Sequence, residues 1–385
     1  MRLALLTHKV DFQDGQGRVN YEIVRAALDR GLQVTVVAEF CSDEIAQHPC
    51  GRFVRMRERH IPTQLLRNLY FAQKSARWLR KHRAEFDVIQ ANGFVTWEPA
   101  DVVAVHFVHE AWLKSASFPF TWRSLNPYAW YQRILALVNK HFERRAFESA
   151  KRLVAVSEAT AKEVANLGID TSKMQVIYNG VDANEFHPPS EADPPTRALF
   201  GLPENVPMLL FVGDIRTPRK NLESVLAALL AIPEAHIAVA GSAAGSPYPA
   251  QVRRMGLAQR VHFLGKISMI PQLMRSVDVF VIPSRYESFG MVVLEAMASG
   301  LPVILSSRVG AVELVRHACR VIEDPDDTSC LTTHISALLN SPETRASMGR
   351  VGRSLALNVQ WSRTAAAYLA LYENHFAAQS PSDRR

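Results

Sequence analysis

The sequence lacks the features that mark a secreted, metal-binding or membrane-spanning protein. It has four cysteines in 385 residues, and they form neither a CxxC pair nor a cluster with metal-ligand spacing, so we expect reduced thiols and no bound metal. No apolar run approaches the roughly 18 residues that a membrane span needs. The opening residues 1–6 are too few for the apolar region of a signal peptide. We therefore expect a cytoplasmic protein.

A third glycine is missing from the loop after the first expected strand. That loop reads Asp14-Gly15-Gln16-Gly17-Arg18-Val19-Asn20, and a dinucleotide-binding fingerprint would have glycine where Asn20 stands. An enzyme that transfers hydride is therefore disfavoured. Gly15 and Gly17 can still present backbone N–H groups to a phosphate at a helix start, although an ordinary turn would use the same residues.

The net charge is +7, and residues 1–185 hold 25 Lys or Arg against 20 Asp or Glu. Two clusters concentrate this excess: Arg52, Arg55, Arg57 and Arg59, and then Lys74, Arg77, Arg80, Lys81 and Arg83. Such clusters favour an anionic partner, which is a membrane surface, a nucleic acid or a phosphorylated substrate. A solvated helix face explains each cluster equally well.

Hydrophobic periodicity predicts alternating strands and helices along the whole chain. In the first half we expect strands at 2–7, 33–38, 86–91, 101–106, 151–156 and 174–178, and helices at 17–30, 63–83, 126–147 and 157–167. In the second half we expect strands at 207–212, 236–240, 260–263, 278–282 and 301–305. Helices are expected there at 219–231, 247–256, 268–276, 291–298, 310–316, 328–339, 342–357 and 361–377.

Length and pattern together predict two domains. A chain of 385 residues exceeds what one core usually supports, and the proline-rich residues 187–195 interrupt the alternation as a linker. We expect two doubly wound α/β domains with parallel sheets. Because ligands bind outside the carboxyl ends of such strands, we expect the site in the cleft between the domains.

Two carboxylates, Glu287 and Glu295, bracket the most informative segment, a strand, loop and helix at 278–300. Counted along a helix, their eight-residue spacing is a rise of roughly 12 Å. Paired acid–base chemistry on one bond needs carboxylates about 5–9.5 Å apart, so the two groups suit the two ends of an elongated ligand. Solvated acids on an exposed face are the alternative, which the apolar neighbours of Glu295 disfavour.

Further candidates follow the carboxyl ends of two expected strands. The loop after 207–212 carries one aspartate and three cations: Asp214, Arg216, Arg219 and Lys220. At a helix start these cations would neutralise a diphosphate without a metal; a basic surface loop is the alternative. His106 ends the strand at 101–106, where a catalytic and a structural histidine are equally expected, and His109 is a further candidate.

These segments coincide with the pattern of one enzyme family. The segments 284–290 and 295–303 resemble glycosyltransferase family 4, and Glu287 with Glu295 matches the E-x7-E motif of retaining glycosyltransferases with the GT-B fold. The segments 156–158 and 176–186 fit the same family. The resemblance covers nearly the whole chain in the right order.

The resemblance implies a role for each candidate residue. His106 would lie near the reacting carbon, Glu287 would contact the donor sugar, and Lys220 with Arg216 would hold the leaving diphosphate. The implied donor-binding residues are Gly15, Gly17, Gly213, Arg216, Lys220, Arg285, Glu287, Ser288, Phe289, Gly290 and Glu295, with Glu295 on the ribose. Many relatives have arginine where Asp214 stands, so Arg216 or Arg219 must replace it, and we favour Arg216. Asp214 would repel a diphosphate unless it points away or pairs with a cation.

The resemblance also implies the fold and the reaction. A GT-B chain has two Rossmann-like domains that face each other across a cleft. Here we expect one domain at 1–186 plus about 361–385, with the last helix crossing back to it, and the other at 187–360. The enzyme would move a hexose-type sugar from a UDP-sugar, or a GDP-sugar, to a hydroxyl acceptor with retention of configuration. It would need no metal and no other cofactor.

Other functions and the acceptor stay open. The alternatives are a sugar-nucleotide epimerase or hydrolase with the same architecture, and a non-catalytic protein that binds nucleotide-sugar or nucleic acid. We expect no nucleic acid, because the basic residues lack a recognition module. The basic and aromatic segments at 63–83 and 118–133 favour a lipid-linked or glycolipid acceptor and peripheral binding to the inner face of an anionic membrane. Core packing of their apolar residues is the alternative.

Overall fold

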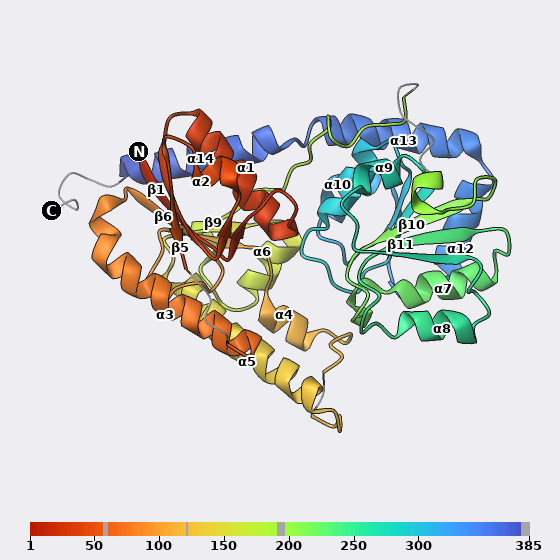
Figure 1. Ribbon diagram of the computed structural model, residues 1–385, viewed down its shortest axis with the longest axis horizontal. Helices are drawn as coiled ribbons and strands as arrows, with labels where there is room; N and C mark the ends of the chain where they lie inside the picture. Colours follow the sequence, from red (N-terminus) through yellow and green to blue (C-terminus); the bar gives the residue numbers. More distant parts are fainter. Residues whose placement is uncertain (57–60, 121, 191–196, 379–385) are drawn as a thin grey trace. The chain divides into compact units, whose positions relative to one another are not determined.

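The computed structural model describes residues 1–56, 61–120, 122–190 and 197–378, and its contacts divide the chain into two compact units (Figure 1). Unit 1 comprises Met1–Lys114, Phe120–Asn179 and the chain from Trp361 onward, and unit 2 comprises Ser115–Pro119 and Gly180–Gln360. The predicted boundary was at 186. Arg57, Arg59, most of the predicted linker and the tail from residue 379 lie outside the described residues.

Unit 1 is built on a seven-stranded parallel sheet. In spatial order its strands are β5 (Gly51–Arg55), β3 (Gln33–Ala38), β1 (Arg2–Leu6), β6 (Val88–Asn92), β7 (Val102–Val105), β8 (Arg152–Ala155) and β9 (Met174–Val176). Its helices are α1 (Gly15–Asp29), α2 (Asp43–Ala46), α3 (Gln64–His82), α4 (His109–Lys114), α5 (Pro127–Ser149), α6 (Glu158–Ala165) and α14 (Trp361–Ala378). The short strands β2 (Lys9–Val10) and β4 (Phe40–Cys41) pair with each other.

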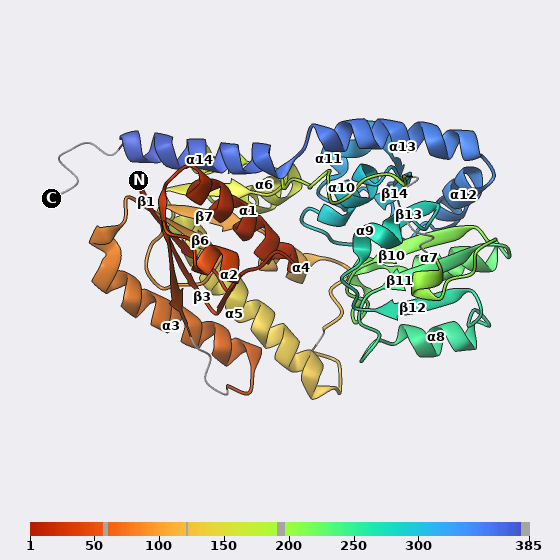
Figure 2. The same ribbon diagram turned by 45° about the horizontal axis from the view of Figure 1, so that its top comes forward.

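Helices α3 and α5 cover one face of this sheet, and α1 and α14 cover the other (Figure 2). Phe71 and Leu79 of α3 and Phe147 of α5 pack against strand residues such as Ile89 in one buried cluster. This two-sided cover explains why the central strands are continuous apolar runs, which is the pattern of a parallel sheet. The return of α14 to unit 1 confirms the predicted crossing of the last helix.

Unit 2 is built on a six-stranded parallel sheet. In spatial order its strands are β12 (Val261–Gly265), β11 (His236–Ala240), β10 (Met208–Val212), β13 (Val279–Ile282), β14 (Val303–Ser306) and β15 (Arg320–Ile322). Its helices are α7 (Leu222–Leu230), α8 (Tyr248–Arg254), α9 (Ile270–Met274), α10 (Met291–Ala298), α11 (Val312–Val315), α12 (Thr328–Leu339) and α13 (Pro342–Leu357). Helices α7, α8 and α12 share the apolar cluster on one face.

Both sheets run outward from a central strand in two directions. In unit 2 the strand order is that of a Rossmann fold, 3-2-1-4-5-6 counted along the chain, and unit 1 adds a seventh strand to the same order. The order reverses between β1 and β6 in unit 1 and between β10 and β13 in unit 2. The prediction of two doubly wound, parallel α/β units is confirmed. None of the helices in the described ranges is long and apolar enough to cross a membrane.

Candidate functional site

The candidate residues gather where each strand order reverses, at the carboxyl ends of the strands. In unit 2, Gly213 directly follows β10, and Glu287 lies in the loop that follows β13. In unit 1, His8 follows β1, and Gly93 follows β6. In open parallel sheets, ligands lodge at such reversal points because two loops diverge there and leave a crevice.

The centre of the unit 2 site is an ion pair between Lys220 and Glu287. Both side chains are largely buried, and Arg219 stands beside them with its Nη1 atom 3.5 Å from a carboxylate oxygen of Glu287. The methylenes of Lys220 lie across Gly213, where a Cβ atom would be 3.2 Å from Cε of the lysine. Gly213 has a φ of +152°, so glycine serves both the backbone and the close approach of the lysine.

Glu287 is held in its charged form. Burial alone would raise the pKa of this carboxyl, but the charges of Lys220 and Arg219 and the hydrogen bond from Lys220 outweigh it and lower the pKa below its ordinary value. The backbone of Glu287 forms a bridge with Val309 and accepts from the N–H of Gly310. The carboxylate therefore stands at a fixed position in a loop.

In the loop that carries Lys220, Arg216 makes a two-bond contact with Asp214, at 2.9 Å from Nε and from Nη2, so the charge of Asp214 is paired within the loop. The arginine beside Glu287 is Arg219. The sequence favoured Arg216 as the partner of Lys220 on the diphosphate, and that assignment stays a prediction. The helix expected from residue 219 begins at Leu222, because η4 (Pro218–Lys220) precedes it and Asn221 has a φ of +60°.

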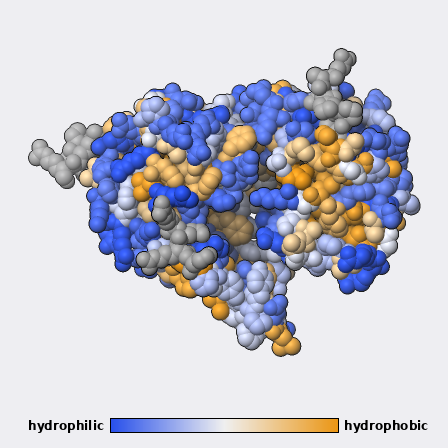
Figure 3. Space-filling view, in the orientation of Figure 1, coloured by the Kyte–Doolittle hydropathy of each residue, from blue (hydrophilic) through white to orange (hydrophobic). Residues whose placement is uncertain are grey.

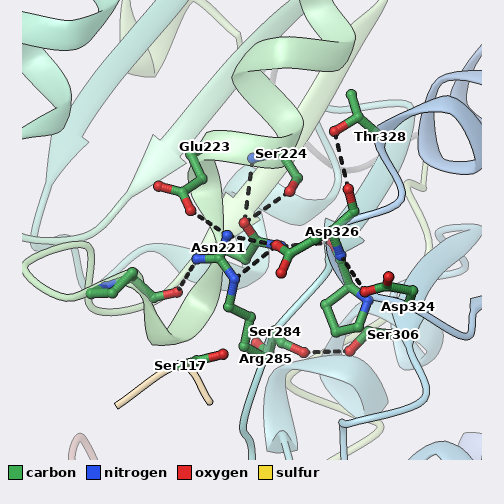
Figure 4. Close-up of polar contacts among 12 residues, drawn as sticks. Ser117, Asn221, Glu223, Ser224, Ser284, Arg285, Ser306, Asp324, Asp326 and Thr328 are labelled. Carbon is green, nitrogen blue, oxygen red and sulfur yellow. Dashed lines mark hydrogen bonds and ion pairs between the residues drawn. The ribbon is translucent and has the colours of Figure 1, made fainter. Parts of the chain in front are cut away.

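Arg285 is tied into the protein by a polar network (Figure 4). Its guanidinium binds the carboxylates of Glu223 and Asp326 and donates to the carbonyl oxygen of Pro218 at 3.0 Å. In Figure 4 the side chain lies between these acidic groups, which come from the start of α7 and from the loop before α12. It was predicted to contact the donor, and its contacts here are to the protein.

The other predicted donor residues surround the start of α10. Ser288 and Phe289 follow Glu287, Gly290 caps the helix with a φ of +90°, and Glu295 lies in the middle of the helix. The helical count between the two glutamates does not apply, because the helix begins only at Met291 and Glu287 is in the bridged loop before it.

Two polar hollows open at the reversal point of unit 1. They have volumes of about 330 Å³ and about 290 Å³, and they share His8, Gln16 and Gln64. The smaller hollow is also lined by Asn68, Asn92, His106, His109, Asn139 and Glu143. Amide, imidazole and carboxylate groups of this kind bind hydroxyl groups, because each offers a donor or an acceptor.

His106 and His109 both line the smaller hollow, and His109 is oriented by its neighbours. Its backbone N–H donates to Glu143 at 2.8 Å, its Nδ1 lies 3.0 Å from the other oxygen of Glu143, and its Nε2 lies 3.2 Å from the amide of Asn139. The Nε2 of His106 is enclosed without a hydrogen-bond partner, and burial lowers the pKa of His106 to about 4. His106 is therefore neutral near neutral pH, and His109 is the better oriented histidine.

The predicted glycine loop forms the first turn of α1. The N–H of Gly17 donates to the carboxylate of Asp14, the helix cap, at 2.9 Å. Asn20, at the place of the missing glycine, is fully buried and donates to Thr7 and to the carbonyl of Lys9, both at 2.9 Å. Its amide oxygen accepts from Asn92 at the end of β6, so Asn20 links the two strands at the reversal point.

The sequence reasoning missed Asn20, Glu143, Asn139 and Asn221. A single sequence does not separate such polar residues from those at a surface position. Within the described ranges, no three His, Cys, Asp or Glu residues are grouped so as to hold a metal ion.

The chain has two Rossmann-like units. One has a cationic pair on a buried glutamate, and the other has a polar hollow. Together these features define the class of GT-B glycosyltransferases. Comparison with known proteins gives the family. The model of glycosyltransferase family 4 matches residues 13–185, and the model of glycosyl transferases group 1 matches residues 194–355. The chain therefore belongs to the glycosyltransferases of the family 4 type.

Its relatives support the same placement. A D-inositol 3-phosphate glycosyltransferase of Mycolicibacterium smegmatis is 31% identical over 240 residues, which are 60% of this chain and 54% of that protein. The chain spans about half the length of the curated relatives that head the comparison.

Solved structures share the fold at low identity. Sucrose-phosphate synthase from Thermosynechococcus elongatus has a TM-score of 0.77 at 21% identity, and the match covers 98% of this chain and 100% of that one. The Anabaena protein HepE in complex with UDP-glucose has a TM-score of 0.74 at 21% identity, with 97% and 100% covered.

Proposed function

We propose that this protein transfers a hexose-type sugar from a UDP-sugar to a hydroxyl acceptor, with retention of configuration and without a metal. The observation that carries the proposal is the pairing of Lys220 and Arg219 with Glu287 at the reversal point of unit 2. Two fixed cations suit a diphosphate, and a carboxylate beside them suits sugar hydroxyls. A structural neighbour binds UDP-glucose, which supports UDP as the first choice of donor and leaves a GDP-sugar second.

In this proposal the cations act on the leaving group. As the bond between the anomeric carbon and the diphosphate breaks, negative charge grows on the diphosphate, and Lys220 with Arg219 stabilises it. The acceptor oxygen forms the new bond on the same face, and its proton passes to the departing diphosphate. Glu287 holds the donor sugar by its hydroxyls. Arg216, the arginine first predicted for this role, is held by Asp214.

The acceptor is proposed to bind in the two hollows of unit 1. Their lining of Gln16, Gln64, Asn68, Asn92 and Asn139 presents amides that can both donate and accept hydrogen bonds. This suits a hydroxylated acceptor. His109, oriented by Glu143, is proposed to take the place near the reacting carbon that the sequence assigned to His106.

The donor is identified by a thermal-shift screen of UDP-, GDP- and ADP-sugars, because a ligand that binds the folded state raises its stability. We expect the largest shift with a UDP-sugar and none from added Mg²⁺ alone. The sugar-nucleotide hydrolase or epimerase is distinguished by following donor consumption with and without acceptor. Equal consumption in both cases contradicts transfer, and no shift with any nucleotide-sugar contradicts donor binding altogether.

We further propose that the acceptor is lipid-linked and that unit 1 binds an anionic membrane through α5. Of the 15 large apolar side chains that are exposed in the described ranges, six lie within 16 residues at the start of α5. This α5 patch consists of Trp122, Leu125, Tyr128, Trp130, Ile134 and Leu137. Leu125 is 94% exposed. Figure 3 shows apolar surface at its lowest part, where the turn before α5 lies in Figure 1.

The charges around the α5 patch match an anionic surface. From residue 111 to 142 the sequence has four Lys or Arg and no Asp or Glu. Helix α3, whose first turn donates to Tyr131 of α5, has five Lys or Arg and no acid. Trp and Tyr favour the boundary between water and lipid, and each Lys or Arg near an anionic leaflet adds about 1 kcal/mol of attraction. A partner with these properties is a bilayer that contains anionic phospholipid.

Sedimentation with vesicles of phosphatidylcholine and phosphatidylglycerol tests this proposal. We expect binding that weakens as salt rises, and that the double change Leu125→Glu with Ile134→Glu weakens it at least about tenfold. The control is Leu230→Glu with Leu357→Glu, which changes two exposed leucines of unit 2. Absence of vesicle binding at low salt contradicts the proposal. A wild-type dimer that becomes a monomer in the α5 double variant also contradicts it.

A further inference from the structure

The side chain of Arg285 forms hydrogen bonds with three separate segments of unit 2. Its Nε and Nη2 reach Asp326 at 2.8 and 2.6 Å, Nη2 also reaches Glu223, and Nη1 reaches the carbonyl of Pro218. A guanidinium has five N–H donors, and these contacts account for four of them. Arg285 would have to break some of these hydrogen bonds to bind a phosphate. Its geometry therefore disfavours a direct role in donor binding.

Two of the contacts of Arg285 go to the turn that carries the site cations. Besides the bond to Pro218, the backbone N–H of Arg285 donates to the carbonyl oxygen of Arg219 at 2.8 Å. Pro218 and Arg219 are the first two residues of η4, and Lys220 is the third. The turn is therefore held from outside at the two residues that precede Lys220.

Asn221 holds the same turn at its other end. Asn221, the residue after Lys220, has a φ of +60°, a conformation that costs a non-glycine residue of order 1 kcal/mol or more. Its amide donates to the carbonyl of Pro325 at 2.7 Å and to Asp326 at 3.3 Å, and its oxygen accepts from Ser224. Asp326 thus contacts both Asn221 and Arg285. Figure 4 shows that the hydrogen bonds of these two residues meet at this carboxylate.

We propose that Arg285, locked by Asp326 and Glu223, is a positioning residue that fixes Lys220 and Arg219 for the donor diphosphate. The inference rests on the proposed function, and it replaces the donor contact that the sequence assigned to Arg285. Lys220 needs such support because its side chain must lie over Gly213 to reach Glu287. A shift of the turn by a fraction of its length would remove the lysine from the diphosphate while leaving the rest of the donor site intact.

A double-mutant cycle measured by calorimetry tests the inference. Arg285→Gln should weaken UDP binding about tenfold and UMP binding less than twofold, because only the diphosphate depends on Lys220. In a Lys220→Ala background, Arg285→Gln should weaken UDP binding by a clearly smaller factor, because only the position of Arg219 is then left to lose. The control Arg316→Gln removes an exposed ion pair with Glu323 in the same unit and should change neither ligand.

A second measurement needs no ligand. Hydrogen exchange of the amides at 219–224 should accelerate in Arg285→Gln and in Asp326→Asn, and it should stay unchanged in Arg316→Gln. Additive losses of UDP affinity in the cycle would show that Arg285 contacts the donor itself and would overturn the inference, as would unchanged exchange. A wild-type protein that binds no UDP would count against the proposed donor, and the exchange measurement would then decide on Arg285 alone.

Discussion

At the scale of single residues, the unit 2 site consists of charges that are paired within the protein. Glu287 neutralises Lys220, and Asp214 neutralises Arg216. In the proposed reaction, an entering diphosphate would compete with Glu287 for Lys220, and the released carboxylate would accept hydrogen bonds from sugar hydroxyls.

Replacing Lys220 by alanine should lower turnover at least about 10²-fold, because charge on the leaving diphosphate then loses its nearest cation. Steady-state kinetics with the donor found in the screen would measure the effect. Lys266→Ala removes an exposed lysine of unit 2 and is the matched control. Near-normal turnover of Lys220→Ala would contradict the electrostatic account.

Replacing Gly290 by alanine should destabilise unit 2 by about 2 kcal/mol through backbone strain and a clash. Gly290 has a φ of +90°, and a Cβ there would lie 2.9 Å from Val309. Gly256→Ala separates the two causes, since Gly256 has a φ of +70° with open space around it. Denaturant unfolding should show the larger loss for Gly290→Ala; equal losses would mean that strain alone matters.

At the scale of elements, the central strands and the edge strands β9 (Met174–Val176) and β12 (Val261–Gly265) were predictable, whereas the other two edge strands were not. Strands such as β1 and β10 are unbroken apolar runs because helices cover both of their faces. The edge strands β5 and β15 were missed, since β5 carries Arg52 and Arg55 and β15 has three residues. Charge at an edge discourages pairing with another chain, and the same charge hides the strand from a search for apolar runs.

The site was predictable to the same degree. Glu287 and Lys220 lie together because both follow strands at one reversal point, which strand order reveals. The partner of Glu287 among the arginines was not predictable, because it depends on a turn of three residues and on the backbone of Asn221. The role of α5 in holding His109 was also hidden, since Glu143 lies 34 residues along the chain.

Helix α5 should matter for turnover through Glu143. Glu143→Ala removes the acceptor for both N–H groups of His109, and we expect turnover to fall about tenfold or more because the imidazole loses its orientation. Glu148→Ala changes an exposed glutamate of the same helix that pairs with Arg144 and should have no effect. Equal turnover in the two variants, with both proteins folded, would exclude His109 from the site.

At the scale of the whole molecule, the end of the chain belongs to the unit with which the chain begins. Helix α14 buries Tyr368 and Tyr372, and the hydroxyl of Tyr372 donates to Gln90 of β6. His375 of the same helix lies 3.5 Å from Asp101, a fully buried carboxylate that also binds Arg83 and Lys151. The packing of unit 1 thus includes a segment that follows all of unit 2 in the sequence.

Asp101 and His106 should make unit 1 lose stability in two successive steps as pH falls. Burial lowers the pKa of His106 to about 4, against roughly 6.5 unfolded, so its contribution is complete above pH 6.5 and is lost between 6.5 and 4. Burial would raise the pKa of Asp101, but the hydrogen bond from His375 and the charge of Arg83 outweigh it and lower the pKa to about 2. Against roughly 3.9 unfolded, its contribution is lost between pH 3.9 and 2.

The two steps can be separated by calorimetry of the variants across pH. His106→Gln should flatten the loss of melting temperature between pH 6.5 and 4 and leave the lower step. Asp101→Asn should remove the lower step and cost about 3 kcal/mol at pH 7, because it leaves Arg83 and Lys151 without their shared carboxylate. Because unit 2 contains neither residue, its transition should not move in either variant. The prediction is contradicted if stability is lost in a single step that both variants change in the same way. Titration of His106 and of Asp101 would then be coupled.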